Sequence, residues 1–539
     1  MGIALSVATC GAFGVFAAVP TSQTIADDSA ANAQGKYTIS VATNDTHTYT
    51  VYQILTGTLI AGESKLGNPQ WGADATKTGN TGVDDFITSI TASGLTNVQI
   101  DDFVKAELKS GATGQGTVSA STSLDVDPGY YLIVDTTANL EDGDAKSLNI
   151  VAVFNDITIT PKKGTVESEK HVDDQNDSDS SDFSKLKDSA DYDIGDSIPY
   201  TLTMTLPDDY ANYKQYKIVF TDDMSAGLTF NNDAKIFYGA TDTTGTSISF
   251  VEGGNSSYTS PSAGKVYTYT IANLKADQGA DGASDALKAL GARSVIKITY
   301  TATLNSNAVV GSAGNPNKYK VDFSSNPNQD ANGTPDTNDT PWDINIVFTY
   351  KTVFNKVDAD KKPLTGADFT LFKFVEGSGT DTYGEGANAK NGTWTDVTAL
   401  GSGSNKPSKK TEDFTKGSDT ANAAKFTFSG LDAGVYKLVE TTTPTGYNKL
   451  EDQIFTITAE HTLEAANPTL ESLTGTDGAQ FTMTADKTEG SLTAEIENNQ
   501  GATLPSTGGM GTTIFYIIGV VLLAGAAIIL VTKRRMNAE

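Results

Sequence analysis

The sequence predicts an all-β protein made of tandem immunoglobulin-like β-sandwich domains with few short helices. Segments such as Val266–Ile271, Val295–Leu304 and Lys425–Phe428 alternate β-branched or aromatic residues with other residues, a period of two that is typical of half-buried strands. Clusters of Gly, Asn, Asp and Pro separate these segments, as turns do. With 539 residues the chain is long enough for three or four domains that each bury a core. Many short strands with turn-rich connections favour immunoglobulin-like sandwiches.

Helices are expected to be short and few, and two segments carry clear helix signals. Residues Asp101–Lys109 begin with two acids and are followed by Gly111. Residues Ser284–Leu290 begin with a residue that caps helices well and are followed by Gly291. Acids or a serine at the start and a glycine after the end are the usual boundary signals of a helix.

Composition restricts the partners of the chain. The formal net charge is −28 and the pI is about 4.4, so nucleic acid and anionic lipid surfaces are excluded as partners by repulsion. The single cysteine, Cys10, lies in the N-terminal apolar run, so the chain that remains after loss of that run has no disulfide. Exported proteins commonly gain durability from disulfides, and another covalent source of durability is therefore expected.

The N-terminus has the pattern of a secretory signal. Residues Ile3–Val19 are almost wholly apolar and are followed by a polar stretch rich in Ala and Ser, which fits the h-region and cleavage region of a signal peptide. Cleavage after Ala26 or after Ala33 fits, and we assign residues 1–33 to the signal. No Lys or Arg precedes Lys36, so the basic n-region is missing, and we interpret the start as truncated.

The C-terminus carries three features in a fixed order. Leu504-Pro505-Ser506-Thr507-Gly508 is followed by the uncharged apolar run Ile514–Val531 and then by the basic residues Lys533, Arg534 and Arg535. As a helix the apolar run is about 27 Å long, close to the thickness of a bilayer core, and basic residues stay on the cytoplasmic side. The order resembles the LPXTG cell-wall sorting signal of Gram-positive surface proteins. A plain transmembrane anchor is the alternative.

That resemblance implies a chemical fate for the chain. A sortase recognises residues 504–508, its cysteine attacks the carbonyl of Thr507, and Gly508 leaves with the membrane segment. An amine then resolves the acyl-enzyme, so that one difficult step is divided into two easier ones. We therefore expect transient membrane anchoring, sortase cleavage and attachment to peptidoglycan on the cell surface, with Thr507 as substrate.

Shifts in composition divide the chain into segments. We expect an N-terminal domain at 34–165, a middle domain at 166–350, a C-terminal domain at 351–499 and the sorting segment at 500–539. The Asp/Ser-rich stretch Asp173–Asp182 is interpreted as a solvated loop. Neither it nor Asn328–Asp339 has the glycine and bidentate glutamate of an EF-hand, so no metal is expected.

Signatures of enzymes are absent from the sequence. It contains no GxSxG, no P-loop, no GxGxxG and no HExxH motif, and we expect neither catalysis on an external substrate nor a cofactor. The only histidines are His47, His171 and His461, which we expect in surface positions or loops.

Three further patterns resemble those of Gram-positive major pilins. Tyr436–Thr441, followed by Pro444 and Gly446-Tyr447, resembles the pilin E-box. Asp156–Lys162 resembles the pilin motif that closes a first pilin domain, although Thr160 stands where a tyrosine is usual. Tyr49–Ile54 and Pro128–Leu132 are similar to sequence segments that are typical of backbone subunits. The chain thus resembles the sortase-dependent backbone pilins, or fimbrial subunits, whose domains are sandwiches of the CnaA and CnaB types.

The pilin resemblance implies polymerisation. The amine of Lys162, with Lys163 as its rival, resolves the acyl-enzyme formed on Thr507 of a neighbouring identical subunit and builds a head-to-tail fibre. The implied partners are a pilin-specific sortase, a housekeeping sortase, peptidoglycan and a minor tip pilin. Adhesion is the implied purpose, with a receptor that the sequence does not indicate. The alternative is a monomeric wall-anchored adhesin or a minor pilin.

The resemblance also implies isopeptide bonds between Lys and Asn inside domains. The reaction needs a lysine, an asparagine and an acid buried together, because burial favours a neutral amine and a protonated acid. In the C-terminal domain we expect Lys356 and Asn498 to be joined, with Glu440 as the catalytic acid. Strand parity agrees, since Lys356 is in phase with Phe354 and Asn498 with Ile496.

In the middle domain we expect Lys170 to react, with Asp222 as the acid. Asp222 is in phase with Ile218 and Phe220 and should face the core. Asn317 shares the phase of Tyr319 and is the chosen acceptor, whereas Asn326 lies out of phase and is the alternative. Ordinary hydrogen bonding of these polar residues is the competing interpretation. No comparable group is found in the N-terminal domain, and the sequence does not decide whether that domain has a cross-link.

Overall fold

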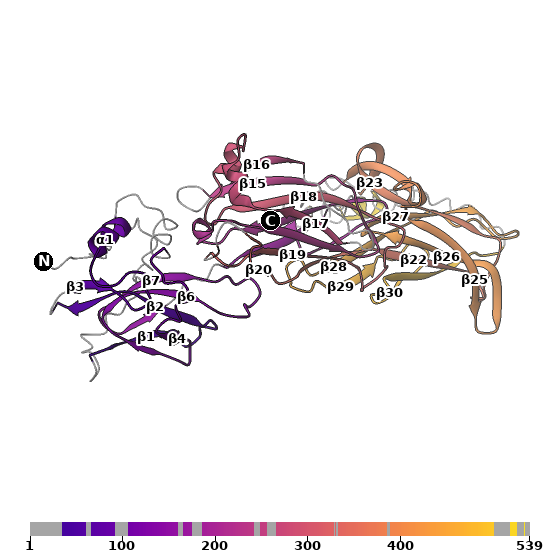
Figure 1. Cartoon of the computed structure of the whole chain (residues 1–539). Helices are drawn as coiled ribbons and strands as arrows, with labels where there is room; N and C mark the ends of the chain where they lie inside the picture. Colours follow the sequence, from indigo (N-terminus) through magenta and orange to yellow (C-terminus); the bar gives the residue numbers. More distant parts are fainter. Residues whose placement is uncertain are drawn as a thin grey trace.

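The computed structural model describes most of the chain. The described residues are 35–60, 66–91, 106–159, 165–174, 186–241, 248–255, 266–327, 329, 333–384, 389–500, 518–524, 526 and 533. Three groups of β-sheets follow one another along an elongated molecule (Figure 1). Helices are short and few among these residues, and the all-β prediction is confirmed.

The N-terminal group of sheets carries two small cores. Its larger sheet has the strand order β3-β2-β6-β7 with β4 beside β2, and its smaller sheet has the order β5-β1-β8. Residues Gly129–Asp135 are buried at six of their seven positions, as expected of a central strand with cores on both faces. The elements are β1 (Tyr37–Val41), β2 (Tyr49–Leu59), β3 (Leu66–Trp71), α1 (Val83–Thr91), β4 (Gly116–Val118), β5 (Leu124–Val126), β6 (Gly129–Asp135), β7 (Leu148–Val153) and β8 (Ile157–Ile159).

The middle group is a sandwich around one core. One sheet has the order β10-β9-β12-β18-β15-β16 with β14 beside β18, and the other has β11-β21-β19-β13-β17 with β20 beside β19. Strand β12 alternates strictly between buried and partly exposed residues, so one face packs on the core. The elements are β9 (Glu167–Asp173), β10 (Leu186–Lys187), β11 (Ser189–Asp191), β12 (Ser197–Thr205), η1 (Tyr210–Asn212), β13 (Ile218–Met224), β14 (Leu228–Phe230), β15 (Lys235–Thr241), β16 (Ile248–Asn255), β17 (Val266–Ile271), α3 (Leu274–Gly279), α4 (Asp285–Lys288), β18 (Val295–Leu304), β19 (Asn315–Ser324), β20 (Thr337–Asp339) and β21 (Asp343–Phe348).

The C-terminal group is a second sandwich, with strand orders β25-β26-β22-β31-β30 and β24-β23-β27-β28-β29. Its core is rich in phenylalanine: the ring of Phe354 packs edge-on against Phe428, Phe455 and Phe481, an arrangement that aromatic quadrupoles favour. The elements are β22 (Tyr350–Val357), β23 (Asp368–Tyr383), β24 (Lys390–Asp396), η3 (Val397–Ala399), β25 (Ser408–Lys416), β26 (Asp419–Leu431), β27 (Gly434–Thr442), β28 (Gln453–His461), β29 (Leu470–Gly475), β30 (Thr484–Asp486) and β31 (Ser491–Glu497).

The local expectations are largely met. The three segments predicted as strands form β17, β18 and part of β26. The helix expected from Ser284 forms as α4, because the Ser284 hydroxyl accepts a hydrogen bond from the backbone N–H of Leu287. The helix expected at Asp101–Lys109 falls partly outside the described residues.

Direct backbone hydrogen bonds join successive groups. Between the N-terminal and middle groups, Gly143 N donates to Asp339 O at 2.7 Å and Lys146 N donates to Ser325 O at 2.7 Å. Between the middle and C-terminal groups, Ile194 N donates to Gly430 O at 3.0 Å. The two junctions are therefore packed contacts of the main chain.

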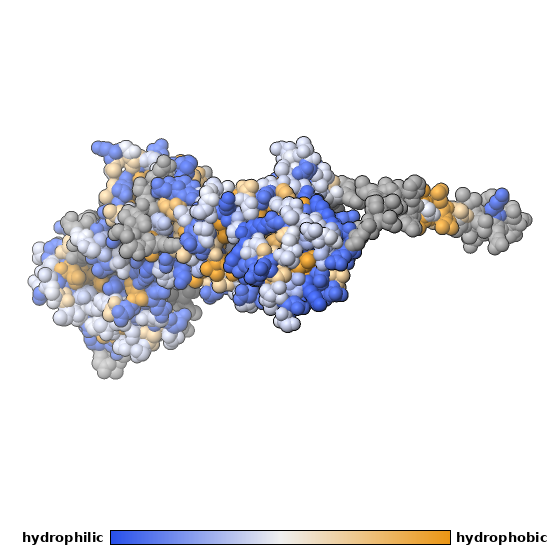
Figure 2. All heavy atoms as spheres, turned by 90° about the vertical axis from the view of Figure 1, so that its right-hand side faces the viewer, coloured by the Kyte–Doolittle hydropathy of each residue, from blue (hydrophilic) through white to orange (hydrophobic). Residues whose placement is uncertain are grey.

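The surface of the body is mostly hydrophilic on the face seen in Figure 2. In the part of the C-terminus that is described, Ile518 and Val520 to Leu523 are exposed large apolar residues. No helix formed by the described residues is long and apolar enough to cross a membrane. Several expectations concern segments outside the described residues, namely residues 1–33, Lys162, Lys163, residues 504–508 with Thr507, and most of Ile514–Val531.

Candidate isopeptide sites

The structure brings together the three residues expected in the C-terminal domain. Lys356 lies on β22, Asn498 follows β31 directly, and Glu440 lies on β27 in the facing sheet. Strands β22 and β31 pair in parallel with Lys356 opposite Ile496, so Asn498, two residues further on, points to the same side. All three side chains are buried.

Hydrogen bonds hold the amide and the acid of this site in contact. Asn498 Nδ2 donates to Glu440 Oε1 at 2.9 Å, and Leu450 N donates to Glu440 Oε2 at 2.8 Å. Asn498 Oδ1 is buried and has no hydrogen-bond partner among the described residues. A buried amide oxygen without a donor is costly, and the carboxyl group of Glu440 already contacts the same amide.

The amine of this site is held by main-chain oxygens. Lys356 Nζ donates to Ile496 O at 2.8 Å and to Val357 O at 3.0 Å. Burial lowers the pKa of Lys356 to about 8, although the Glu440 carboxylate opposes the shift. Desolvation disfavours the charged amine, so a useful fraction of Lys356 is neutral, and therefore nucleophilic, near neutral pH.

The middle group also buries its expected lysine and acid together. Lys170 lies on β9 and Asp222 on β13 of the facing sheet, and Lys170 Nζ donates to Asp222 Oδ2 at 2.7 Å. Burial lowers the pKa of Lys170, and the Asp222 carboxylate opposes that shift. The strand-parity argument for Asp222 therefore agrees with where the structure places its side chain.

Sequence reasoning missed the tyrosine at the centre of this group. The Tyr300 hydroxyl lies 2.9 Å from Lys170 Nζ, 2.8 Å from Asn317 Nδ2 and 2.6 Å from Asp222 Oδ2, to which it donates. The signal was present in the strand predicted at Val295–Leu304, where Tyr300 shares the phase of Ile298. Tyr300 links the amine, the acid and the amide in one network.

Two buried asparagines, not one, lie in the middle site. Asn317 on β19 pairs with Asn345 on β21 across the sheet, and Asn345 Nδ2 donates to Lys170 O at 3.0 Å. Both side chains are fully buried, and neither Oδ1 atom has a hydrogen-bond partner among the described residues. Asn326 is only partly buried and donates to Asp336 Oδ2 at 2.8 Å. Asn345 is therefore a candidate acceptor that the sequence reading overlooked.

The N-terminal group contains a buried polar cluster of another kind. His47 Nδ1 lies 2.6 Å from Asp135 Oδ2 and His47 Nε2 lies 3.3 Å from Asp144 Oδ2. His47 is 2% exposed and His461 has a 6% exposed side chain, so the expectation that the histidines lie at the surface is wrong for both. Two carboxylates satisfy the ring nitrogens of His47, which makes its burial tolerable.

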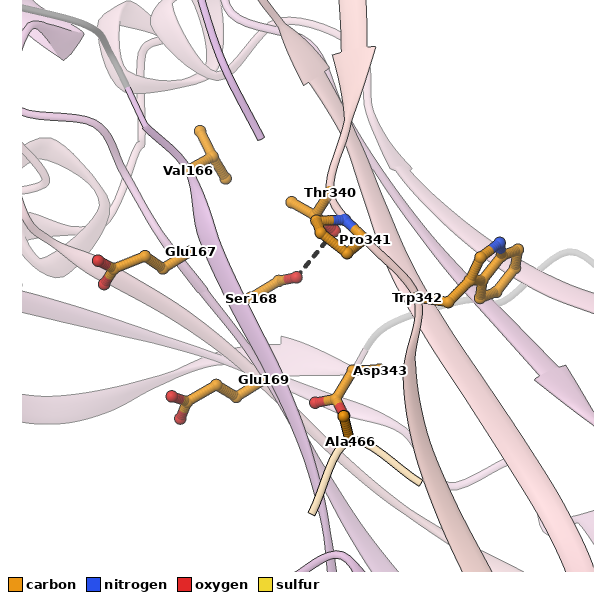
Figure 3. Close-up of a pocket in the computed structure, with 9 residues that line it drawn as sticks. All are labelled: Val166, Glu167, Ser168, Glu169, Thr340, Pro341, Trp342, Asp343 and Ala466. Atoms are coloured by element: carbon orange, nitrogen blue, oxygen red, sulfur yellow. Dashed lines mark hydrogen bonds between the residues drawn. The ribbon is translucent and has the colours of Figure 1, made fainter. Parts of the chain in front are cut away.

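A surface hollow of about 360 Å³ lies where β9 meets the segment before β21. Figure 3 shows Ser168 and Thr340 pointing toward one another, joined by a 2.8 Å hydrogen bond, while Glu167 and Glu169 point to the other side of the strand. The hollow is lined by Val166, Glu167, Ser168, Glu169, Thr340, Pro341, Trp342, Asp343 and Ala466. This lining includes no histidine, lysine or cysteine, so beside the hydroxyls of Ser168 and Thr340 it offers only carboxylates as bases.

Two families match parts of the chain. Residues 351–469 match the family described as a prealbumin-like fold domain, and residues 496–538 match the LPXTG cell wall anchor motif. The chain is thus similar to sortase-dependent, LPXTG-anchored pilins of Gram-positive bacteria. The match to the anchor motif supports display at the cell-wall surface, as expected from the C-terminal sequence.

A curated relative matches most of the body of this chain. The trypsin-resistant surface T6 protein of Streptococcus pyogenes serotype M6 is 27% identical over 395 residues. The match spans 64% of this chain and 65% of that protein, slightly less than two thirds of its length.

Two solved structures are similar to this chain. The T6 backbone pilin of serotype M6 S. pyogenes has a TM-score of 0.46 at 17% identity, covering 87% of this chain and 98% of that chain. The major pilin SpaD of Corynebacterium diphtheriae has a TM-score of 0.43 at 18% identity, with the same two coverages.

Proposed function

We propose that this pilin is the structural subunit of a covalently polymerised pilus shaft that serves adhesion, and that it is not an enzyme. The observation that carries the proposal is that two successive sandwiches each bury a lysine with an acid and an asparagine. A fibre under tension needs bonds that do not dissociate, and a chain whose only cysteine is Cys10 cannot obtain them from disulfides.

Polymerisation is proposed to occur through Lys162. A pilin-specific sortase forms a thioester on Thr507 and releases Gly508, and the neutral Lys162 amine of the next subunit attacks that thioester. An amide forms and the sortase thiol is released. A housekeeping sortase then transfers the finished fibre to peptidoglycan. Residues 1–33 direct export, and residues 514–531 hold the chain in the membrane before cleavage.

Within the C-terminal domain we propose a bond between Lys356 and Asn498. The neutral Lys356 amine attacks the Asn498 carbonyl carbon while protonated Glu440 donates to Oδ1, and ammonia leaves. The buried, partner-free Oδ1 and the 2.9 Å contact between Asn498 and Glu440 support this assignment. The middle domain is proposed to join Lys170 to Asn317 by the same reaction, with Asp222 as the acid.

The domain boundaries remain part of the proposal. The division at 34–165, 166–350 and 351–499 assigns one group of sheets to each domain and fits the three groups of Figure 1. Each of the two domains with a proposed bond then contains all of its reacting residues.

The shaft function is tested on a denaturing gel of cell-wall extract probed with antibody against this pilin. Parent cells should show a ladder of high-mass species, which Lys162→Ala should abolish and Lys163→Ala, its matched control, should leave unchanged. A ladder lost only with Lys163→Ala would move the linkage to that residue. A single monomer-sized band in expressing parent cells would instead indicate a monomeric wall adhesin.

A further inference from the structure

A third buried lysine lies outside both proposed sites, at the junction of the middle and C-terminal groups. Lys373, on β23, is fully buried, and its Nζ lies 2.6 Å from Asp193 Oδ2 and 3.0 Å from Asp432 Oδ2. The two carboxylate side chains are only 2% and 1% exposed. Asp193 follows β11 of the middle group, whereas Asp432 lies in the turn between β26 and β27 of the C-terminal group. The cluster therefore spans two sandwiches.

The carboxyl group of Asp193 is oriented for attack by this amine. Its Oδ1 accepts the backbone N–H of Asp432 at 3.0 Å, and its Oδ2 faces Lys373 Nζ. A backbone N–H directed at Oδ1 stabilises negative charge on that oxygen as a tetrahedral intermediate forms. Oδ1 can thus remain as the amide oxygen, while Oδ2, the atom next to the amine, leaves.

The charges around Lys373 favour a proton on a carboxyl group. Two buried carboxylates share one ammonium, and a third, Asp191, lies nearby with its Oδ2 accepting the N–H of Ala433 at 3.1 Å. Burial, helped by the nearby Asp174 carboxylate, raises the pKa of Asp191 to about 7. Closely spaced buried carboxylates cannot all be ionised, so a neutral amine beside a carboxylic acid is an accessible state of this cluster.

We propose that Lys373 and Asp193 form an isopeptide bond that joins the middle and C-terminal sandwiches, with Asp432 carrying the proton. The neutral Lys373 amine attacks Cγ of protonated Asp193. Asp432 takes a proton from the attacking nitrogen and delivers it to Oδ2, which leaves as water. One C–N bond forms and one C–O bond breaks, with no oxidant, reductant or metal required, and Asp432 ends in its starting state.

The consequence is mechanical. The bonds proposed at Lys356 and Lys170 each close within a single sandwich, whereas this one crosses between two sandwiches. Tension along the chain would then pass through a covalent link at the junction, and the two sandwiches could not separate without breaking it. An ion pair in the same position would part when the junction opens.

The test is peptide mapping of the purified full-length pilin, denatured and digested with trypsin. The bond joins the tryptic peptides 188–214 and 362–390 into one species about 18 Da lighter than their sum, and it prevents cleavage after Lys373. Free peptides 362–373 and 374–390 with no joined species would overturn the proposal. A species that joins 362–390 to 426–437 would overturn it too, since the acceptor would then be Asp432.

Two variants separate the reaction from simple packing. Asp432→Ala should abolish the joined species and restore cleavage after Lys373, while the masses still show the Lys356 bond as evidence of a folded C-terminal sandwich. Lys409→Ala, which removes a partly exposed ion pair with Asp368, is the matched control and should leave the joined species unchanged. Undiminished joining in Asp432→Ala would refute the proton-carrying role of Asp432.

Discussion

The middle and C-terminal sandwiches bury the same three kinds of residue but connect them differently. In the C-terminal site the acid Glu440 contacts the asparagine, and among the described residues the lysine donates hydrogen bonds only to main-chain oxygens. In the middle site the acid Asp222 contacts the lysine directly, and the asparagine is reached through the hydroxyl of Tyr300. The acid thus contacts the proposed electrophile in one case and the proposed nucleophile in the other.

The difference follows from which strands carry the residues. Lys356 and Asn498 lie on neighbouring parallel strands of one sheet, so the facing sheet has room to direct Glu440 at the amide. Lys170 lies on one sheet, while Asp222 and Asn317 lie on the other, so the lysine crosses the core and meets the acid first. The two strand arrangements therefore bring a lysine, an acid and an asparagine together, but with different hydrogen bonds among them.

The largest effect is expected from Asp222→Ala. It removes both the proposed acid of the middle site and the direct partner of a fully buried lysine. Loss of a cross-link that closes a loop of about 150 residues costs about 5 kcal/mol of unfolding free energy, and an unpaired buried lysine adds to that cost. Mass spectrometry should show a gain of about 17 Da from retained ammonia, in addition to the change of side chain, and calorimetry should show earlier unfolding.

Asp223→Ala is the matched control, because Asp223 is the next residue of the same strand and is partly exposed. It should leave both the mass deficit and the unfolding temperature near those of the parent. If Asp222→Ala keeps the mass deficit, Asp222 is not the acid of this site. The contrast between the positions of the acid in the two sandwiches would then not hold.

Glu440→Ala should have a somewhat smaller effect on stability. It abolishes the C-terminal bond, with the same gain of about 17 Da and a loss of about 5 kcal/mol for a loop of about 140 residues. Lys356, however, keeps its two main-chain acceptors. Its buried amine therefore keeps its hydrogen-bond partners, whereas Lys170 loses its acidic partner in Asp222→Ala. Glu451→Ala, at an exposed residue, is the control for intact mass and thermal unfolding. A parent protein without the mass deficit would rule out this bond.

The sequence predicts those features of the fold and of the sites that follow from the alternation of residues along a single strand. The β-fold follows from a period of two, and the same period places Lys356, Glu440 and Asp222 inward, as observed. Alternation along a strand does not show which of two inward-facing asparagines on paired strands lies nearer to the lysine amine. Asn345 was overlooked for this reason. Lys373 and His47 were missed because their partners come from distant segments of the chain. The residues next to them in the sequence do not indicate these contacts.

The acceptor in the middle site is decided by a pair of variants. Asn317→Ala should restore the ammonia mass and lower the unfolding temperature by nearly as much as Asp222→Ala, because the cross-link is lost while Lys170 keeps Asp222. Asn345→Ala should keep the bond and cost only about 1–3 kcal/mol through the Lys170 carbonyl that it leaves without that donor. Intact mass of each purified variant gives the answer. The reverse result would make Asn345 the acceptor and leave Asn317 with a supporting role.

The smallest effect concerns pH and isolates the amine of the C-terminal site. In Asn498→Ala no bond can form, and Lys356 is left to titrate with a pKa lowered by burial to about 8, against 10.5 when unfolded. Between these values the unfolded chain binds more protons than the folded chain, so stability rises as pH increases from about 8 to 10.5, by at most about 1.4 kcal/mol per pH unit. Urea unfolding across that range measures the slope. The double variant Lys356→Met with Asn498→Ala removes the titrating amine, so its stability should not rise with pH in this way. An equal slope in the single and double variants would mean that Lys356 is not the group that burial keeps neutral.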